Sequence, residues 1–238
     1  TLTGTNAFSG GTTVNAGATL QISSDGNLGV YNLVSPVTSI TLNGGTLAAS
    51  GQSTDLLMGS NRRISIGALG GTLSNLSSTY ALRVYGNVTA TGPVTLVGGN
   101  MLELASLSTT GTVTQTSGNL TATSITAGGA VSLTGGTLSV SSLTSPGAVT
   151  LTGSGITVGN ISTSGSGAGI LFKSTGSIAQ NGSTTVSSAG GNITYWSDSD
   201  GNNAGAIHLA AGSSGNRTTV TTSGGLALTA NSTPYPRS

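Results

Sequence analysis

Carboxylates are the side chains most able to do acid–base chemistry, and this chain has few of them. Its five acids are Asp25, Asp55, Glu103, Asp198 and Asp200. Glycoside hydrolysis needs two carboxyl groups facing one another across a bond, and lyases need a base, usually with metal-binding acids. In the 18-residue repeat that the chain contains, Glu103 aligns with Thr121 and Ser139, so no acid stacks on it. The sequence therefore predicts no catalytic site, although a polysaccharide-acting enzyme stays the alternative.

One polar cluster could bind a ligand or a metal. It reads Asp-Ser-Asp-Gly-Asn-Asn from Asp198 to Asn203. Alternate acids with a glycine can wrap calcium, but the spacing lacks the glycine and the distant glutamate of an EF-hand. Asx-rich loops also form turns with no metal. Calcium at Asp198 and Asp200 is thus a weak hypothesis, and no cofactor is predicted.

Trp196 lies two positions before this cluster, where an aromatic ring could stack on a sugar. If Ile193 points inward in a strand, Trp196 points outward, beside Asp198 and Asn202. A large flat ring with polar neighbours is suited to carbohydrate binding. These three residues are the predicted ligand-binding site, and the alternative is a tryptophan that covers the edge of a coil next to a turn.

The remaining ionisable candidates are not expected to form a site. His208, between Ile207 and Leu209, is expected on an outer face without a chemical partner. The pair Arg62-Arg63 has Asp55 as its nearby acid and is predicted to be a polar loop.

Hydroxyl side chains form short ladders that resemble the flat arrays of ice-binding solenoids. Thr114, Ser132 and Thr150 occupy the same position in successive repeats, and Thr116, Thr134 and Thr152 share another. The array is three coils deep, and threonine is also a common outward residue of strands. Ice binding is therefore an alternative and not the leading interpretation.

The elements that must position these residues are predicted by an internal repeat from Gly111 to Ser162. Two series of aliphatic residues recur every 18 positions: Leu102, Leu120, Leu138 and Ile156, and Leu107, Ile125, Leu143 and Ile161. Such a repeat indicates one unit stacked on copies of itself. Each unit alternates at period 2 and turns at glycines, which predicts about three short strands per coil of a parallel β-helix. Val131, Leu133, Leu138, Val140 and Leu143 are expected in its core, and Gln115 is expected to bond a backbone group there.

Outside this region the coils are predicted to be longer. Leu47 and Leu73 end equivalent Gly-Gly-Thr-Leu segments, but they are separated by more than one length of the central repeat. Irregular excursions are expected at residues 23–37, 50–63 and 197–204, which hold Asp25, Tyr31, Asp55, Arg62, Arg63, Asp198 and Asp200. Residues 231–238 are expected to form a tail.

Composition agrees with a β-helix and excludes other classes. Charged residues are 5% and aromatic residues 3%, whereas glycine fills 40 positions. A narrow core needs few aliphatic side chains, and its outer faces accept Thr, Ser and Asn. A net charge of +1 with scattered basic residues gives no stripe for nucleic acid, and the absence of cysteine excludes a disulfide scaffold. No apolar run approaches the length of a membrane-spanning helix.

Two stretches resemble known families. Residues 1–22, with Leu2, Gly4, Phe8, Gly10-Gly11 and Leu20, closely resemble the autotransporter-associated β-strand repeat. Residues 88–159 resemble the repeats of filamentous haemagglutinin-type large exoproteins. The resemblance implies a right-handed helix, export across the outer membrane with a translocator partner, and a secreted or cell-surface location.

Together these observations predict an all-β, right-handed parallel β-helix over residues 1–238. The repeat sets the length of the middle coils, and longer, looped coils are expected at both ends. The expected role is that of a fragment of a longer bacterial adhesin. It would not be an enzyme, and it would touch a host or environmental glycan or surface through irregular loops.

Overall fold

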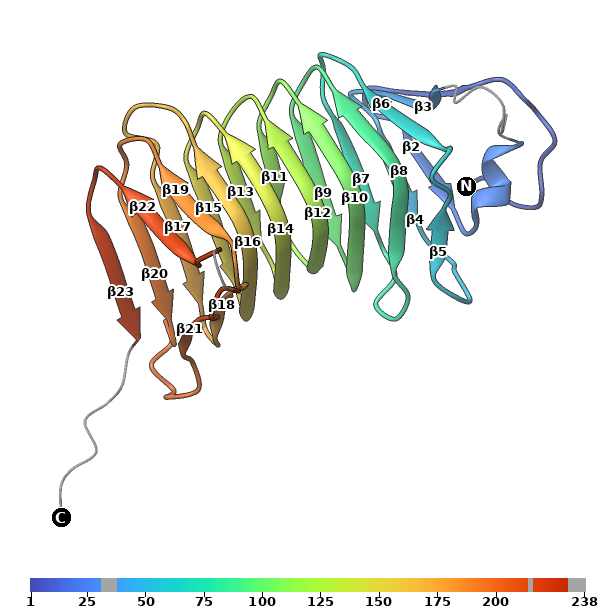
Figure 1. Ribbon diagram of the computed structural model, residues 1–238. Helices are drawn as coiled ribbons and strands as arrows, with labels where there is room; N and C mark the ends of the chain where they lie inside the picture. Colours follow the sequence, from blue (N-terminus) through green and yellow to red (C-terminus); the bar gives the residue numbers. More distant parts are fainter. Residues whose placement is uncertain (31–37, 214–215, 231–238) are drawn as a thin grey trace.

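The computed structural model describes residues 1–30, 38–213 and 216–230, which form a parallel β-solenoid (Figure 1). All the strand pairings within its two sheets are parallel, and the sheets share one elongated core. The all-β solenoid prediction is thereby confirmed, and the right hand of the helix stays a prediction from the family resemblance. Tyr31 and the predicted tail at 231–238 lie outside the described residues.

The first sheet has ten strands, one from each successive coil, so that each strand pairs with its counterpart one coil away. In spatial order they are β2 (Thr19–Ile22), β4 (Thr46–Ala49), β7 (Gly71–Asn75), β9 (Val94–Gly98), β11 (Val113–Gln115), β13 (Val131–Thr134), β15 (Val149–Gly153), β17 (Ile170–Ser174), β20 (Ile193–Ser197) and β23 (Leu226–Ala230).

The second sheet has thirteen strands and wraps the rest of each coil. Its main path is β1 (Thr12–Asn15), β3 (Thr38–Asn43), β6 (Arg63–Ile66), β8 (Leu82–Ala90), β10 (Met101–Thr109), β12 (Asn119–Ala127), β14 (Thr137–Ser145), β16 (Gly155–Thr163), β18 (Ile178–Gln180) and β21 (Ile207–Leu209). Beside this path, β5 (Leu56–Met58) pairs with β8, and β19 (Thr185–Ser188) pairs with β16 and with β22 (Thr219–Thr222).

The predicted 18-residue register is confirmed in the central coils. Val113 pairs with Val131 and Val131 with Val149, while Leu138 pairs with Ile156. The five residues expected in the core are at most 1% exposed: Val131, Leu133, Leu138, Val140 and Leu143. Stacking like on like is what a coil repeated at constant length must produce.

The central coils contain two strands each, where three were expected. Residues 137–145 form one nine-residue strand, in which alternation of buried and exposed side chains resets at Ser141 and Ser142. Two successive residues that both turn away from the core let the strand bend without losing its parallel partner. The predicted second and third segments of each coil are therefore halves of one bent strand.

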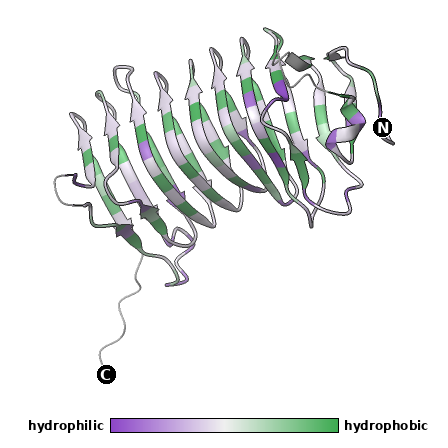
Figure 2. Cartoon of the chain, turned by 45° about the vertical axis from the view of Figure 1, so that its right-hand side comes forward, coloured by the Kyte–Doolittle hydropathy of each residue, from purple (hydrophilic) through white to green (hydrophobic). Residues whose placement is uncertain are grey.

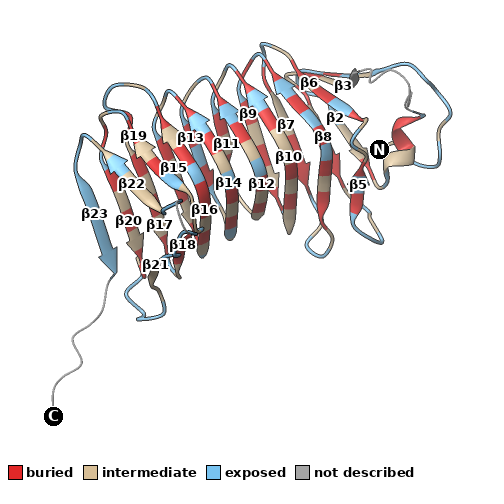
Figure 3. Ribbon diagram, viewed as in Figure 1, coloured by how far each residue is buried: buried red, intermediate tan, exposed pale blue. Residues whose placement is uncertain are grey.

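The core is a set of apolar columns that run along the rod, seen as repeated buried bands in Figure 3 and hydrophobic bands in Figure 2. One column of inward residues crosses the whole ten-stranded sheet: Leu20, Leu47, Leu73, Leu96, Gln115, Leu133, Leu151, Phe172, Tyr195 and Leu228. Gln115 is its one amide. Its Nε2 donates to the backbone oxygens of Ser117 and Gly118, both at 3.0 Å, as predicted.

The two ends of the solenoid differ. At the first coil, Val14 and Ile22 are 5% and 0% exposed, and Leu2 forms a parallel bridge with Ile22, while residues 1–9 bond to residues 21–30, which include the short 3-10 helix η1 (Asp25–Leu28). At the last coil, Leu226 and Leu228 are 51% and 52% exposed. The whole of β23 is exposed in Figure 3. The β2 side of the first coil is therefore partly covered, whereas the last described strand, β23, is open.

Candidate functional site

Three of the longer loops leave the solenoid at one corner. Residues 50–55, 76–81 and 198–206 each follow a strand of the ten-stranded sheet, and they hang from one edge of the rod in Figure 1. The opposite corner, where the chain enters that sheet, is turned by six residues or fewer in every coil. We name the first of these the loop corner. It collects most of the irregular segments that the sequence predicted.

Trp196 lies on the outer face of β20, next to the loop corner. Ile193 and Tyr195 are buried and Trp196 is half-buried, so the predicted outward direction is confirmed. The ring does not stand alone, because the ammonium of Lys173 on β17 lies 4.5 Å from its centroid. Trp196 and Lys173 are register partners, so the parallel sheet itself positions the cation over the ring. Sequence spacing alone gave no sign of this pair, since the coil between them is longer than the central repeat.

Asp198 is not on the surface with Trp196, where it was expected. It is fully buried, and its Oδ2 accepts a hydrogen bond from the backbone N–H of Asn203 at 3.1 Å. Its backbone is left-handed, with φ of 51°, and its carbonyl accepts from the N–H of Gly201. An aspartate that closes its own turn in this way shapes the loop. The predicted surface position of Asp198 beside Trp196 is therefore wrong, and the role that its hydrogen bonds support is to shape the loop.

Asn202 and Asp200 are exposed at the tip of the same loop. Asn202 Nδ2 donates to Asp200 Oδ2 at 2.9 Å, and Asn202 Oδ1 accepts from the N–H of Ala204 at 2.8 Å. The two acids of the calcium hypothesis are thus split between a buried and an exposed position. No cluster of three His, Cys, Asp or Glu side chains suited to a metal occurs in the described ranges. Calcium binding here stays a prediction.

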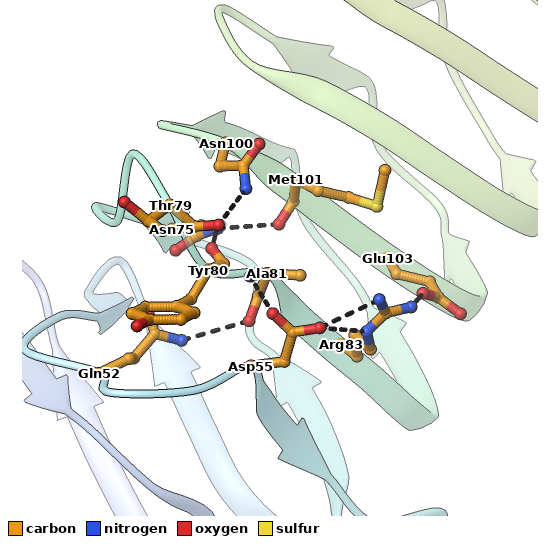
Figure 4. A network of polar contacts seen from close by, with 10 residues as sticks. All are labelled: Gln52, Asp55, Asn75, Thr79, Tyr80, Ala81, Arg83, Asn100, Met101 and Glu103. Carbon is orange, nitrogen blue, oxygen red and sulfur yellow. Dashed lines mark hydrogen bonds and ion pairs between the residues drawn. The ribbon is translucent and has the colours of Figure 1, made fainter.

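A second group of polar residues ties neighbouring loops together at the same corner (Figure 4). Arg83 on β8 pairs with Asp55 at 3.0 Å and with Glu103 on β10. The Asp55 Oδ1 also accepts the backbone N–H of Ala81 at 2.8 Å. This N–H and then the Arg83 guanidinium hold the pKa of Asp55 below its usual value, and Asp55 in turn raises the pKa of Arg83. Carboxylates held ionised in this way are poor general acids.

Amide side chains complete the connection between these loops. Gln52 donates to the carbonyl of Ala81, Asn75 to those of Tyr80 and Met101, and Asn100 to that of Thr79. Figure 4 shows these bonds joining loop 50–55 to loop 76–81 and then to β10. The loops are therefore fixed side by side, and they can present a defined surface.

Arg62 differs most from its prediction as a polar loop residue near Asp55. It is 1% exposed and forms an ion pair with Asp25, while Asp55 pairs with Arg83. Its guanidinium also donates to the carbonyls of Leu28 and Gly29. Arg63, its neighbour, is exposed as expected. Because Asp25 is distant in the sequence, no local pattern could have paired it with Arg62.

The first of the two predicted hydroxyl ladders is longer than the sequence suggested. One outward column on the ten-stranded sheet contains Thr19, Thr46, Thr72, Thr95, Thr114, Ser132 and Thr150 before it reaches Leu171. A fixed spacing could not reveal it because the early coils are longer. The adjacent outward column pairs Thr134 with Thr152, as predicted, but it also holds Val97, Lys173 and Trp196. The ice-binding alternative thus has one long hydroxyl column and a short second one.

The other predicted residues occupy simple positions. His208 is exposed on β21, as expected. Glu103 pairs with Thr121, and Thr121 with Ser139, so the predicted absence of an acid from that side of Glu103 is confirmed. In the described part of the chain, no helix has the length and apolar character needed to cross a membrane. No protein family, curated protein or solved structure matches this chain.

Proposed function

We propose that this chain is a structural and adhesive β-helical segment of a secreted or cell-surface bacterial adhesin, a passenger of the type V secretion class. The observation that carries the proposal is the division of the rod into two kinds of surface. The central strands face outward mainly with small uncharged residues, whereas the Asp55–Arg83–Glu103 ion pairs, the amide bonds between loops and the Lys173–Trp196 pair lie at the loop corner and its margin. Such an arrangement suits a spacer that holds binding loops on a rigid scaffold.

The role is proposed to be non-catalytic. Asp25 and Asp55 are each bound to an arginine, as is Glu103, and Asp198 is buried within its own turn. General acid–base chemistry needs a carboxyl whose pKa is near the working pH, and the lowered pKa of Asp55 moves it away from that range. This distribution supports binding in preference to hydrolysis.

The proposed ligand is a host or environmental glycan, and the proposed contact is Trp196 with Asn202 in the neighbouring loop. Trp196 is half-buried within β20, and Asn202 is exposed in the loop that follows this strand. During export an outer-membrane translocator is the other proposed partner. That partner and the surface location rest on the family resemblance alone.

Replacing Trp196 with alanine tests the binding site. Labelled protein applied to a glycan array should bind one class of saccharide, and Trp196→Ala should reduce that binding at least tenfold, because stacking on an aromatic ring contributes about 1–3 kcal/mol. Tyr85→Ala is the matched control, since Tyr85 is an exposed aromatic residue on the other sheet. Binding that survives Trp196→Ala, or that Tyr85→Ala removes instead, would place the functional surface elsewhere.

A further inference from the structure

The outer face of β17 and β20 carries a patch unlike the rest of its sheet. From β11 to β15 the outward residues are threonine and serine, but the next two strands present Leu171 and Lys173, then Thr194 and Trp196. Register pairs Leu171 with Thr194 and Lys173 with Trp196, so the four side chains form a compact square. Bulk, aromatic character and charge are therefore concentrated at one place on an otherwise flat surface.

An open depression of about 280 Å³ adjoins this patch. Its lining includes Thr150, Leu171, Asn192 and Thr194 from three successive strands. Leu171 and Thr194 belong both to the depression and to the square, and Lys173 and Trp196 follow two positions later, about 7 Å along each strand. The depression thus leads directly to the cation and the indole. Asn192 Oδ1 accepts the N–H of Gly225, so its amide NH₂ is the group that it can offer a ligand.

Lys173 is placed to receive an anion. Its ammonium is held over the Trp196 ring, and no carboxylate in residues 1–30, 38–213 or 216–230 forms an ion pair with it. Among the outward residues from β9 to β23 on this sheet, it is the one charged side chain. The indole restrains the flexible lysine stem, which reduces the entropy lost when the ammonium binds a ligand.

We propose that this surface binds an acidic oligosaccharide, with the carboxylate of one sugar on Lys173 and the next sugar in the depression beside Leu171 and Thr194. Hydroxyls of Thr150 and Thr194 match the hydroxyls of a sugar, and Leu171 matches the apolar face of its ring. The carboxylate forms a charge-assisted hydrogen bond with the ammonium, which is stronger than a bond between neutral groups. This inference rests on the proposed glycan-binding function and specifies the chemical class of its ligand.

The experiment compares an oligogalacturonate with its fully methyl-esterified form, which has the same rings without the charge. Trp196 is the single tryptophan of the chain, so its fluorescence reports binding next to Lys173. We expect the acidic form to bind about tenfold more tightly, with an affinity that falls as salt is added. Lys173→Gln should abolish this preference, and Lys173→Arg should keep it. Arg217→Gln removes an exposed charge associated with the other sheet and should have no effect.

A second pair of variants tests the depression. Thr194→Val removes a hydroxyl from its lining and should weaken binding of the acidic form, whereas Thr114→Val changes the same outward column four strands away and should not. Equal binding of the acid and the ester, lost in Trp196→Ala by calorimetry, would overturn the acidic inference and leave the glycan site standing. An acid preference that persists in Lys173→Gln would also overturn it. Failure of both sugars and of every glycan on the array would overturn the proposed function as well.

Discussion

At the scale of single residues, the core of the later coils depends on a buried polar pair. The Tyr195 hydroxyl donates to Gln180 Oε1 at 2.7 Å across the core. The rings of Phe172 and Tyr195 pack edge to face, with their centroids 4.9 Å apart. Gln180 Nε2 donates onward to the carbonyls of Thr184 and Thr219. The pair therefore links β20 to the β18–β19 connection and to β22.

Tyr195→Phe should destabilise the protein by about 1–2 kcal/mol, because the Gln180 oxygen would then be buried without a donor. Unfolding in urea measures this change. Burial also raises the pKa of Tyr195 well above the ordinary tyrosine value, so the folded state resists its ionisation. Its contribution to stability is therefore complete below a pH of about 10 and declines as the pH rises beyond that value.

The same variant supplies the control for that pH dependence. Tyr195→Phe should lose stability less steeply than the unchanged protein in alkaline urea titrations. Parallel slopes for the two proteins would mean that the Tyr195 hydroxyl is accessible to solvent, against its burial in the core.

At the scale of elements, Arg62 fastens the short helix η1 to the solenoid. It reaches the carboxylate of Asp25 at the start of η1 and the carbonyls of Leu28 and Gly29 at its end. Arg62→Met should reduce the free energy of unfolding by about 3 kcal/mol, as removal of one partner from a buried ion pair does. Arg63→Met is the matched control and should change it by less than about 0.5 kcal/mol, since Arg63 is exposed. Equal effects in urea unfolding would contradict this role.

Where the coil length was constant, sequence reasoning recovered the register and the core residues, although it divided each bent strand into two. The 18-residue spacing identified the core residues of β13 and β14 because one register repeated through the central coils. It could not follow the column from Leu20 to Leu228, since the coils at both ends are longer than the central ones and unequal to each other. Extra residues in a loop change the number of residues between equivalent core positions, but the strands on either side keep their partners.

The candidate site was recovered in part for a related reason. Alternation in β20 predicted that Trp196 faces outward, which is a property of one strand. The approach of Lys173 to that ring and the pairing of Arg62 with Asp25 depend on which strands become neighbours. The burial of Asp198 depends on a left-handed turn that an Asp-Ser-Asp-Gly sequence permits but does not require.

At the scale of the whole molecule, the contrast between the two ends should govern association. Within the described residues, β23 has no strand on its outer side and exposes Leu226 and Leu228, and such edges pair with other chains. Since Val14 and Ile22 at the other end are buried, we expect self-association to depend on concentration and to involve mainly the β23 end. Light scattering over a range of concentrations measures this.

Leu228→Lys should shift that equilibrium toward monomer, because it places like charges at the contact. Leu69→Lys is the control, since Leu69 is 66% exposed but lies far from the open end. A monomer at every concentration would indicate that the open end is protected by another part of the chain.

The loop corner has a consequence for how such a protein can change. A strand of the ten-stranded sheet keeps its partner whether a short turn or a long loop follows it before the next strand, as the connections after β13 and β20 show. Extending a surface loop costs little free energy, because closure entropy grows slowly with length. New peptide sequence can therefore be grafted at 76–81 or 198–206 with the columns of the core unchanged. The solenoid can therefore accept changes in the length and sequence of one loop, by evolution or by design, while the register of its strands stays the same.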